Sequence, residues 1–302
     1  MYTYTWYQWL LFFFIYCFFG WVFESTYVSI CQKRLVNRGF LHAPMLPLYG
    51  SGAILILFVS IPVKENWLLV YILGALAATV LEYVTGVSME FLFKVRYWDY
   101  SHKLLNFQGQ ICLTSTLAWG ALSVLLTEFI HRPIEAFVVD NIPELAGIII
   151  SLVVLAIFLA DLVVSFRDAI KLRGILEKMT EVREEIEALQ KRLGELSQEK
   201  LEQLDAIKEE SFEWLTGLKD GGAERMASRK RAAEEAFGSL SEDIRAQLEQ
   251  RMEHFRASYK SMKVRPYNVK YSILKRNPSA ASKKFEAALN EYKKRVMEKK
   301  GK

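Results

Sequence analysis

Apolar residues form long runs in the first half of the chain, and short polar loops separate these runs. A helix rises about 1.5 Å per residue, so about 20 apolar residues cross the roughly 30 Å of hydrocarbon in a bilayer. Five runs predict membrane-spanning helices, at residues 6–29, 46–62, 67–93, 110–130 and 145–166. The second run is short and begins among two prolines and two glycines, which predicts a broken or tilted helix.

A different period follows the last apolar run. Apolar residues then alternate at intervals of three and four, which is typical of a coiled-coil seam. The seam positions are Leu172, Ile175, Met179, Val182, Ile186, Leu189, Leu193 and Leu196. Two adjacent glycines at 221–222 end this helix, and a second amphipathic helix is expected at 223–262. The seam is covered either by the chain folding back on itself or by a second copy through coiled-coil self-association.

These patterns predict an all-α, polytopic membrane protein with about five transmembrane helices and a cytoplasmic helical, coiled-coil tail. The expected domains are a transmembrane helical domain at 1–166, a coiled-coil helical hairpin at 167–262, and a basic C-terminal tail with a short helix at 263–302. Residues 256–302 hold fifteen Lys and Arg but three Asp and Glu. Such a segment is attracted to anionic lipid headgroups. Nucleic acid is not an expected partner, because no recognition motif accompanies the charge.

Basic residues in the loops predict the orientation. The loop after the first span carries Lys33, Arg34 and Arg38, and the loop after the third carries three more bases. The loops after the second and fourth spans carry one base each. The positive-inside rule therefore predicts a multi-pass protein of the cell membrane with its N-terminus outside and its C-terminus in the cytoplasm. The first span lacks the flanks of a cleaved signal peptide, so we expect it to remain.

Acidic residues inside or at the ends of the spans are the first candidates for a functional site. An ionised carboxylate in hydrocarbon is costly unless it is paired, hydrated or protonated. With the predicted orientation, the helical rise places all of these acids toward the cytoplasmic face. They are Glu24, Glu82, Glu90 and Asp161.

The third predicted span places Glu82, Gly86 and Glu90 on one helical face, because they follow each other at intervals of four. Two interpretations remain open. The acids either pair with Arg38 or Arg96 as part of helix packing, or they line a polar cavity that opens to the cytoplasm.

Two loops lie next to the cytoplasmic ends of the predicted spans, where these acids are expected. Arg38 has five N–H donors and could hold a carboxylate or phosphate, although a basic residue here is also an ordinary topology signal. Its neighbour Asn37 and, in the second loop, Asp99 add polar groups. The candidate residues for a substrate or ion site are Glu24, Asn37, Arg38, Glu82, Glu90 and Asp99.

No motif indicates catalysis. Cys17, Cys31 and Cys112 lack the spacing of a zinc site or disulfide framework. The histidines at 42, 102, 131 and 254 are scattered, and no nucleophile–base pattern occurs. The sequence therefore predicts no catalytic residue, metal or cofactor, and an enzyme is the less favoured class.

Several motifs in order resemble one family. They are Gly20-Trp21 followed by Glu24, Asn37-Arg38-Gly39-Phe40-Leu41, Pro44 and Pro47 with Tyr49-Gly50, Leu81-Glu82-Tyr83, and Trp98-Asp99-Tyr100-Ser101 with Asn106 and Gly109. Over roughly residues 8–130 the chain resembles the bacterial membrane proteins of the CmpB-like family Putative ABC-transporter type IV, described as putative ABC transporter permeases. It differs from that pattern at Met45, Leu46 and Gln110.

The resemblance implies a permease-type transporter component. The chain has no GxxxxGK[ST] phosphate loop, so ATP hydrolysis would need a separate ATPase subunit. Two other classes stay open. One is a non-transporting scaffold or sensor that acts through its coiled-coil tail, and the other is an inner-leaflet lipid-modifying enzyme with Glu82 or Asp99 as base and Arg38 on phosphate.

Overall fold

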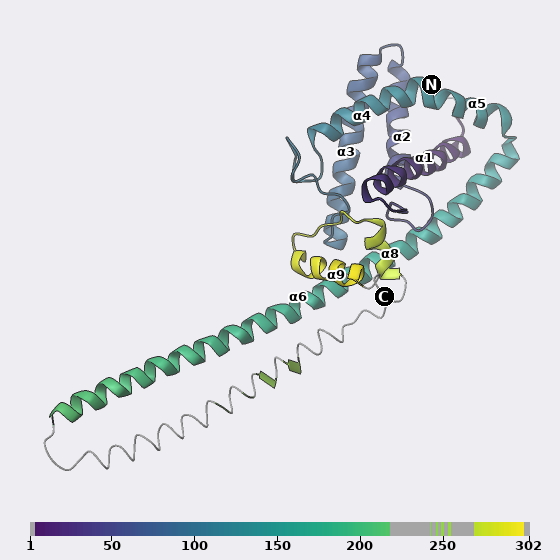
Figure 1. Cartoon of the computed structure of the whole chain (residues 1–302). Helices are drawn as coiled ribbons and strands as arrows, with labels where there is room; N and C mark the ends of the chain where they lie inside the picture. The colour runs from purple at the N-terminus through teal and green to yellow at the C-terminus, as the bar shows by residue number, and fades with distance from the viewer. Residues whose placement is uncertain are drawn as a thin grey trace. The chain divides into compact units, whose positions relative to one another are not determined.

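The computed structural model describes residues 4–217, 242, 246, 249–250, 253–254 and 269–298. These residues form helices and connecting loops without a strand, which confirms the all-α prediction. The elements in Figure 1 are α1 (Trp6–Gln32), α2 (Pro47–Ser60), η1 (Ile61–Val63), α3 (Trp67–Phe93), α4 (Leu113–Leu125), η2 (Leu126–Ile130), α5 (His131–Asn141), α6 (Glu144–Gly217), α8 (Val269–Arg276) and α9 (Glu286–Glu298).

The chain divides into two compact units. The first, here called the membrane unit, comprises Met1–Leu176 with Tyr267–Lys302, and the second comprises Glu177–Pro266. The helix α6 continues without a break from the first unit into the second. The second helix expected at 223–262 falls almost entirely outside the described residues, so the coiled-coil hairpin stays a prediction.

Four described helices are long and apolar enough to cross a membrane. They are Trp6–Gln32, Trp67–Phe93, Leu113–Asn141 and Glu144–Glu185, while the apolar helix Pro47–Val63 is shorter. The prediction of about five spans is therefore close to the structure. One difference concerns the span expected at 110–130, which begins three residues later and continues to Asn141.

Local chemistry explains the boundaries of that span. Cys112 is the N-cap of α4, and its Sγ accepts a hydrogen bond from the Ser115 amide at 3.4 Å. At the other end, Pro133 lacks the N–H that would bond to the preceding turn. The wider π turn η2 comes just before it, and the chain continues as α5 rather than ending near residue 130.

The short α2 starts beside the middle of α1. The Leu46 amide donates to the carbonyl of Cys17 at 2.9 Å, whereas α1 continues to Gln32. Residues 33–46 therefore return along the second half of α1 before α2 begins. Non-helical backbone at membrane depth requires partners inside the protein. The Ser25 and Ser29 hydroxyls, both on α1, accept hydrogen bonds from amides of this loop.

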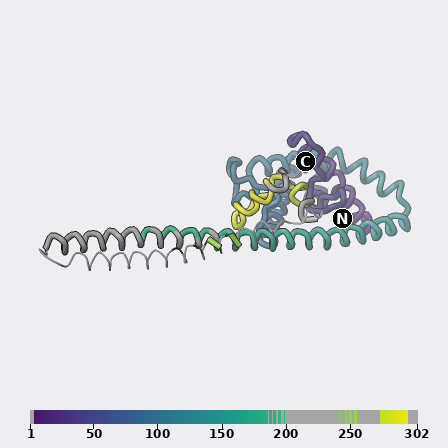
Figure 2. The backbone as a smooth tube through the Cα atoms, turned by 60° about the horizontal axis from the view of Figure 1, so that its bottom comes forward, coloured from purple at the N-terminus to yellow at the C-terminus, as the bar shows by residue number. Residues whose placement is uncertain are grey.

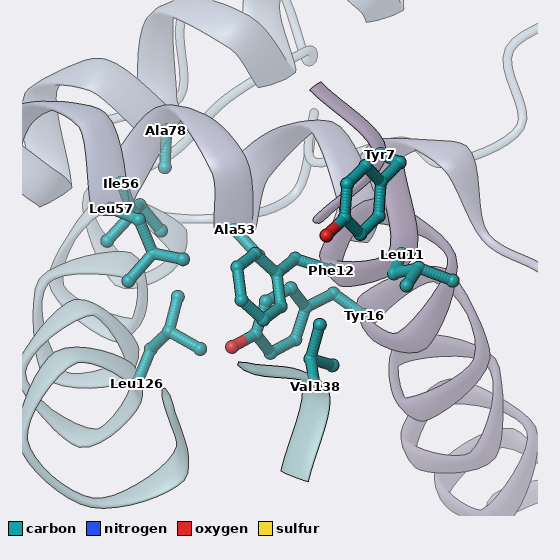
Figure 3. Packing of buried hydrophobic residues seen from close by; sticks show 10 residues of the cluster. All are labelled: Tyr7, Leu11, Phe12, Tyr16, Ala53, Ile56, Leu57, Ala78, Leu126 and Val138. Carbon is teal, nitrogen blue, oxygen red and sulfur yellow. The ribbon is translucent and has the colours of Figure 1, made fainter. Parts of the chain in front are cut away.

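An apolar cluster joins α1, α2, α3, η2 and α5 (Figure 3). Its buried members are Tyr7, Leu11, Phe12, Tyr16, Ala53, Ile56, Leu57, Ala78, Leu126 and Val138. Nearby, α3 and α4 approach closely where Gly74 faces Ser123, because a Cβ on Gly74 would lie 2.2 Å from the Ser123 Oγ. This close contact places the side chains of α3 and α4 within hydrogen-bonding reach of one another.

The C-terminal segment belongs to the membrane unit. Figures 1 and 2 both show α8 and α9 beside the α1–α5 helices. Arg96 and Ala281 exchange two backbone hydrogen bonds of 2.7 and 3.0 Å. The side chains of Ile273, Phe285 and Leu289 are buried. The segment predicted as a basic tail with one short helix thus contains two helices and has a buried apolar face.

The substitution Gly74→Ala should destabilise the membrane unit by about 1–3 kcal/mol, because the added methyl group would force α3 and α4 apart. Thermal unfolding in lipid nanodiscs would measure this loss. The matched control is Gly174→Ala, where nothing lies within 4 Å of the added Cβ. Alanine is the better helix former by about 1 kcal/mol, so this control should be neutral or stabilising. Equal melting temperatures for the two variants would contradict the close packing of α3 on α4.

Candidate functional site

Glu82 is the most deeply placed carboxylate of the predicted set. It lies on α3 with 4% of its surface exposed. The Tyr100 hydroxyl, from the loop after α3, donates to its Oε1 at 3.1 Å. The Trp119 indole N–H, from α4, donates to its Oε2 at 3.1 Å. Both donors are neutral, so they orient the carboxylate without cancelling its charge.

Tyr49 links Glu24 to Trp119, which is itself a hydrogen-bond donor to Glu82. The Tyr49 hydroxyl donates to the Glu24 Oε1 at 3.4 Å, and its ring lies 5.6 Å from the Trp119 ring between centroids. This position requires a glycine on α1, because a Cβ on Gly20 would lie 2.3 Å from the Tyr49 Cβ. The absence of a side chain at Gly20 thus lets α2 place a phenol beside Glu24 and Trp119.

Arg38 completes this group from the returning loop. Its Nη1 donates to the Asn277 Oδ1 at 3.0 Å, and its Nη2 donates to the carbonyl of Tyr97 at 3.2 Å. Burial lowers the pKa of the Arg38 guanidinium, and the negative charge of Glu24 opposes that change. Arg38 therefore contributes a positive charge that neutral acceptors hold in place near the carboxylates.

Together these residues form what we call the Glu82 cluster, which consists of Glu24, Arg38, Tyr49, Glu82, Tyr100 and Trp119. Burial raises the pKa of the Tyr100 phenol far above its ordinary value, and the charges of Glu82 and Glu24 raise it further. The phenol thus stays a neutral donor. Three of the six candidates from the sequence, Glu24, Arg38 and Glu82, come together here.

Glu90 and Asp99 belong to a separate group around a buried arginine. The Arg96 Nε lies 2.8 Å from the Glu90 Oε2, and its Nη1 lies 3.6 Å from the Asp99 Oδ1. The Gln110 amide also donates to Glu90, at 2.6 Å. For Glu90 the expected pairing with Arg96 is present. This group ties the end of α3 to the loop at 94–112.

Asp99 also organises its own loop. Its Oδ1 accepts hydrogen bonds from the Ser101 amide at 3.0 Å and from the Ser101 hydroxyl at 2.5 Å. Burial by itself would raise the pKa of Asp99. The Ser101 hydrogen bonds and the charge of Arg96 outweigh burial and lower the pKa below its usual value.

Asn37 braces the returning loop. Its Oδ1 accepts from the Trp21 indole at 2.6 Å, and its Nδ2 donates to the carbonyl of His42 at 3.0 Å. These contacts satisfy both ends of its amide. Asn37 is thus the sequence neighbour of Arg38, but its own side chain is hydrogen-bonded to Trp21 and to the loop backbone.

Asp161 holds the same loop from α6. Its Oδ2 accepts from the Ala43 amide at 2.8 Å, and its Oδ1 lies 2.9 Å from the His42 Nδ1. The His42 Nε2 lies 3.4 Å from Asp168, one further carboxylate on α6. This intramembrane acid therefore satisfies loop backbone and fixes a histidine.

The C-terminal segment reaches the cluster through Asn277. This buried amide accepts from Arg38 and donates through its Nδ2 to the carbonyl of Gly39 at 3.0 Å. Nearby, the Ser282 hydroxyl donates to the carbonyl of Lys94 at 2.6 Å. The loops at 33–46 and 94–112 are thus both attached to the segment that follows α8.

Sequence reasoning missed Tyr49, Tyr100 and Trp119 as partners of the carboxylates, although the first two stand inside the motifs that carry the family resemblance. Their signal was a polar aromatic residue next to a glycine or an acid in the sequence. Asn277 had no local signal, because it lies 239 residues from Arg38 in the chain.

The substitution Asp99→Asn should lower the thermal stability at neutral pH. A carboxyl whose folded pKa is depressed contributes stability above its unfolded pKa of about 3.9, and this contribution disappears as the pH falls through the folded pKa. The melting temperatures of wild type and variant should therefore differ by a constant amount above about pH 5 and converge below about pH 4. Asp140→Asn, at an exposed position of α5, is the control. A difference that persists in acid would contradict the proposed hydrogen bonding of Asp99.

Comparison with known proteins identifies the family of this chain. The model of the family described as Putative ABC-transporter type IV matches residues 11–166, more than half of the 302 residues. No curated protein matches the chain, and no solved structure matches it. The matched region extends from α1 into α6 and contains every residue of the Glu82 cluster. The apolar helices and this match identify a multi-pass membrane protein, and the chain belongs to the Putative ABC-transporter type IV family.

Proposed function

We propose that the chain is the permease-type component of a membrane transporter and that the Glu82 cluster is its cargo site. The observation that carries the proposal is the buried Glu82 carboxylate, which neutral donors from two other segments hold in one orientation. A charge kept inside a membrane bundle is costly, and such residues commonly mark substrate or ion pathways. The family match supports a role in transport.

The composition of the cluster favours a cargo with a positively charged group. It contains the two carboxylates of Glu24 and Glu82 and one guanidinium. The rings of Tyr49 and Trp119 lie beside them. Carboxylates and aromatic faces both attract cations, and a buried carboxylate gains most from a charged donor.

The basic loops support an orientation in which the cluster faces the cytoplasm. The loops that build it, at 33–46 and 94–112, are the ones that the positive-inside rule assigns to the cytoplasmic side. The exposed lysines Lys275, Lys283 and Lys284 of the C-terminal segment would then face anionic lipid headgroups. In this orientation Asn277 holds Arg38 from the cytoplasmic side.

A transporter of the ABC type needs an ATPase, and this chain carries no phosphate-binding loop. We therefore propose a separate ATPase subunit as partner. The uninterrupted 74 residues of α6 offer a helix on which such a partner can dock.

The second candidate function is a scaffold or sensor that does not transport. The same α6 favours it, because a helix that continues directly from a membrane span can transmit a change in that span to a bound protein. In that case the carboxylates stabilise the fold, and the coiled-coil seam recruits a partner or a second copy.

The substitution Glu82→Gln should reduce transport at least tenfold while the amount of protein in the membrane stays unchanged. The neutral amide keeps the size of the side chain but removes the charge that attracts the cargo. The measurement compares metabolite profiles of cells that lack the protein with those of cells complemented by wild type or variant. The variant should resemble the cells that lack the protein.

Glu65→Gln serves as the matched control, because Glu65 is exposed in the loop before α3. Cells with this control should resemble the wild type. If Glu82→Gln restores the wild-type profile as well, Glu82 is not part of a cargo site.

Affinity capture of the full-length protein from mild detergent should recover a nucleotide-binding ATPase, and mass spectrometry would identify it. Because the cargo site and the docking surface differ, Glu82→Gln protein should capture the same ATPase. Another tagged multi-pass protein is the control for unspecific capture. Recovery of partners without any nucleotide-binding protein would favour the scaffold over the permease.

A further inference from the structure

A second polar network lies inside the membrane unit, apart from the Glu82 cluster. His131, the first residue of α5, is 4% exposed and has a tyrosine at each ring nitrogen. The Tyr16 Oη lies 2.7 Å from Nδ1, and the Tyr4 Oη lies 3.2 Å from Nε2. Tyr4 also donates to Glu135, one turn further along α5. We call these four residues the His131 network.

One arrangement of protons satisfies the whole network when Glu135 is ionised. A carboxylate only accepts, so the single proton of the Tyr4 hydroxyl points to Glu135. The Tyr4 oxygen must then accept from His131, which places the imidazole proton on Nε2. The bare Nδ1 in turn accepts from Tyr16. Every hydroxyl and N–H in the series thus points toward Glu135.

Apolar side chains pack against the imidazole and Tyr16. The Phe12 ring meets the imidazole edge-on at 5.1 Å. Tyr16 is itself a buried member of the apolar cluster, together with Leu57 and Leu126 (Figure 3). Hydrogen bonds in such low-dielectric surroundings polarise one another.

The backbone next to the imidazole is irregular. The π turn Leu126–Ile130 directly precedes His131. Turns of this type are rare and frequently occur at functional sites. His131 and Glu135 follow this turn on α5, and both contact Tyr4 just before α1.

We propose that Tyr16, His131, Tyr4 and Glu135 form a proton relay that links the interior of the helix bundle with water at the end where α1 begins. In one passage Glu135 takes the proton of Tyr4, Tyr4 takes the Nε2 proton of His131, and Nδ1 takes the proton of Tyr16. When a change in helix packing admits water to Tyr16, that water restores the Tyr16 proton, and water at the surface removes the proton from Glu135. The imidazole stays neutral, and its proton moves from Nε2 to Nδ1.

The charges near the relay are few and identifiable. Glu135 acts on His131 from the same helix. Glu128, one turn before His131, is paired with Arg132 at 2.8 Å. The network receives Tyr4 from the residues before α1 and Tyr16 from α1, whereas α2 and α6 contribute apolar side chains to the adjoining cluster. The relay does not depend on the cargo proposed for the Glu82 cluster.

The position of the imidazole proton tests the relay. Full-length protein with ¹⁵N-labelled histidine is placed in lipid nanodiscs, and the His131 signal is identified by its loss in His131→Gln. At neutral pH the wild type should carry the proton on Nε2. Lowering the pH should add a proton at the outer end of the series, reverse its hydrogen bonds and move the imidazole proton to Nδ1. A proton on Nδ1 at neutral pH would overturn the proposal without any variant.

Three variants separate a relay from a merely structural histidine. Glu135→Gln can still accept from Tyr4 but cannot take up a proton, so the Nε2 proton should stay in place throughout the same pH range. Tyr4→Phe keeps Glu135 but removes the hydroxyl that joins Glu135 to His131. This variant should therefore also lose the movement of the imidazole proton with pH. Tyr7→Phe changes a buried tyrosine of α1 outside the network and should keep the response to pH. The same response to pH in wild type and Tyr4→Phe would overturn the relay, whereas loss of transport in Glu82→Gln alone leaves it intact.

Discussion

Backbone polar groups that leave a helix at membrane depth must find partners inside the protein, and this constraint organises the membrane unit. The returning loop at 33–46 meets it with side chains from neighbouring helices. Amides of the loop donate to Ser25 and Ser29 on α1 and to Asp161 on α6. Asn277 donates to a loop carbonyl from the C-terminal segment. The loop can therefore bring Arg38 beside the carboxylates only because these four side chains hold it.

The same constraint divides the intramembrane acids by role. Asp161 satisfies loop backbone, and Glu90 neutralises the buried Arg96. Glu82 has neither task, because its hydrogen bonds come from side chains of Tyr100 and Trp119. An acid with a structural partner can be explained by stability. A buried acid held only by neutral donors is better explained by a role in function.

Two polar groups thus lie within one bundle, and α1 contributes a residue to each. The Glu82 cluster draws on α1 to α4 and the loops, whereas the His131 network joins Tyr4, which precedes α1, and Tyr16 of α1 to α5. The apolar cluster of Figure 3 includes Tyr16 of the second group and Ala78, one turn before Glu82. Close-packed apolar side chains exclude water, so a carrier with this arrangement would open each polar group by a change in helix packing.

The sequence by itself determined the apolar spans, the helical continuation into α6 and the stripe that carries Glu82 and Glu90, because hydrophobic period and spacing are local properties of a helix. Only the tertiary structure decided which acid meets which partner. His131 contacts Tyr16, which lies 115 residues before it in the chain, and Arg38 contacts Asn277, which lies 239 residues after it. A hydrogen bond requires its donor and acceptor atoms to lie about 3 Å apart in a defined direction. A local sequence pattern does not specify this geometry for two segments that are far apart in the chain.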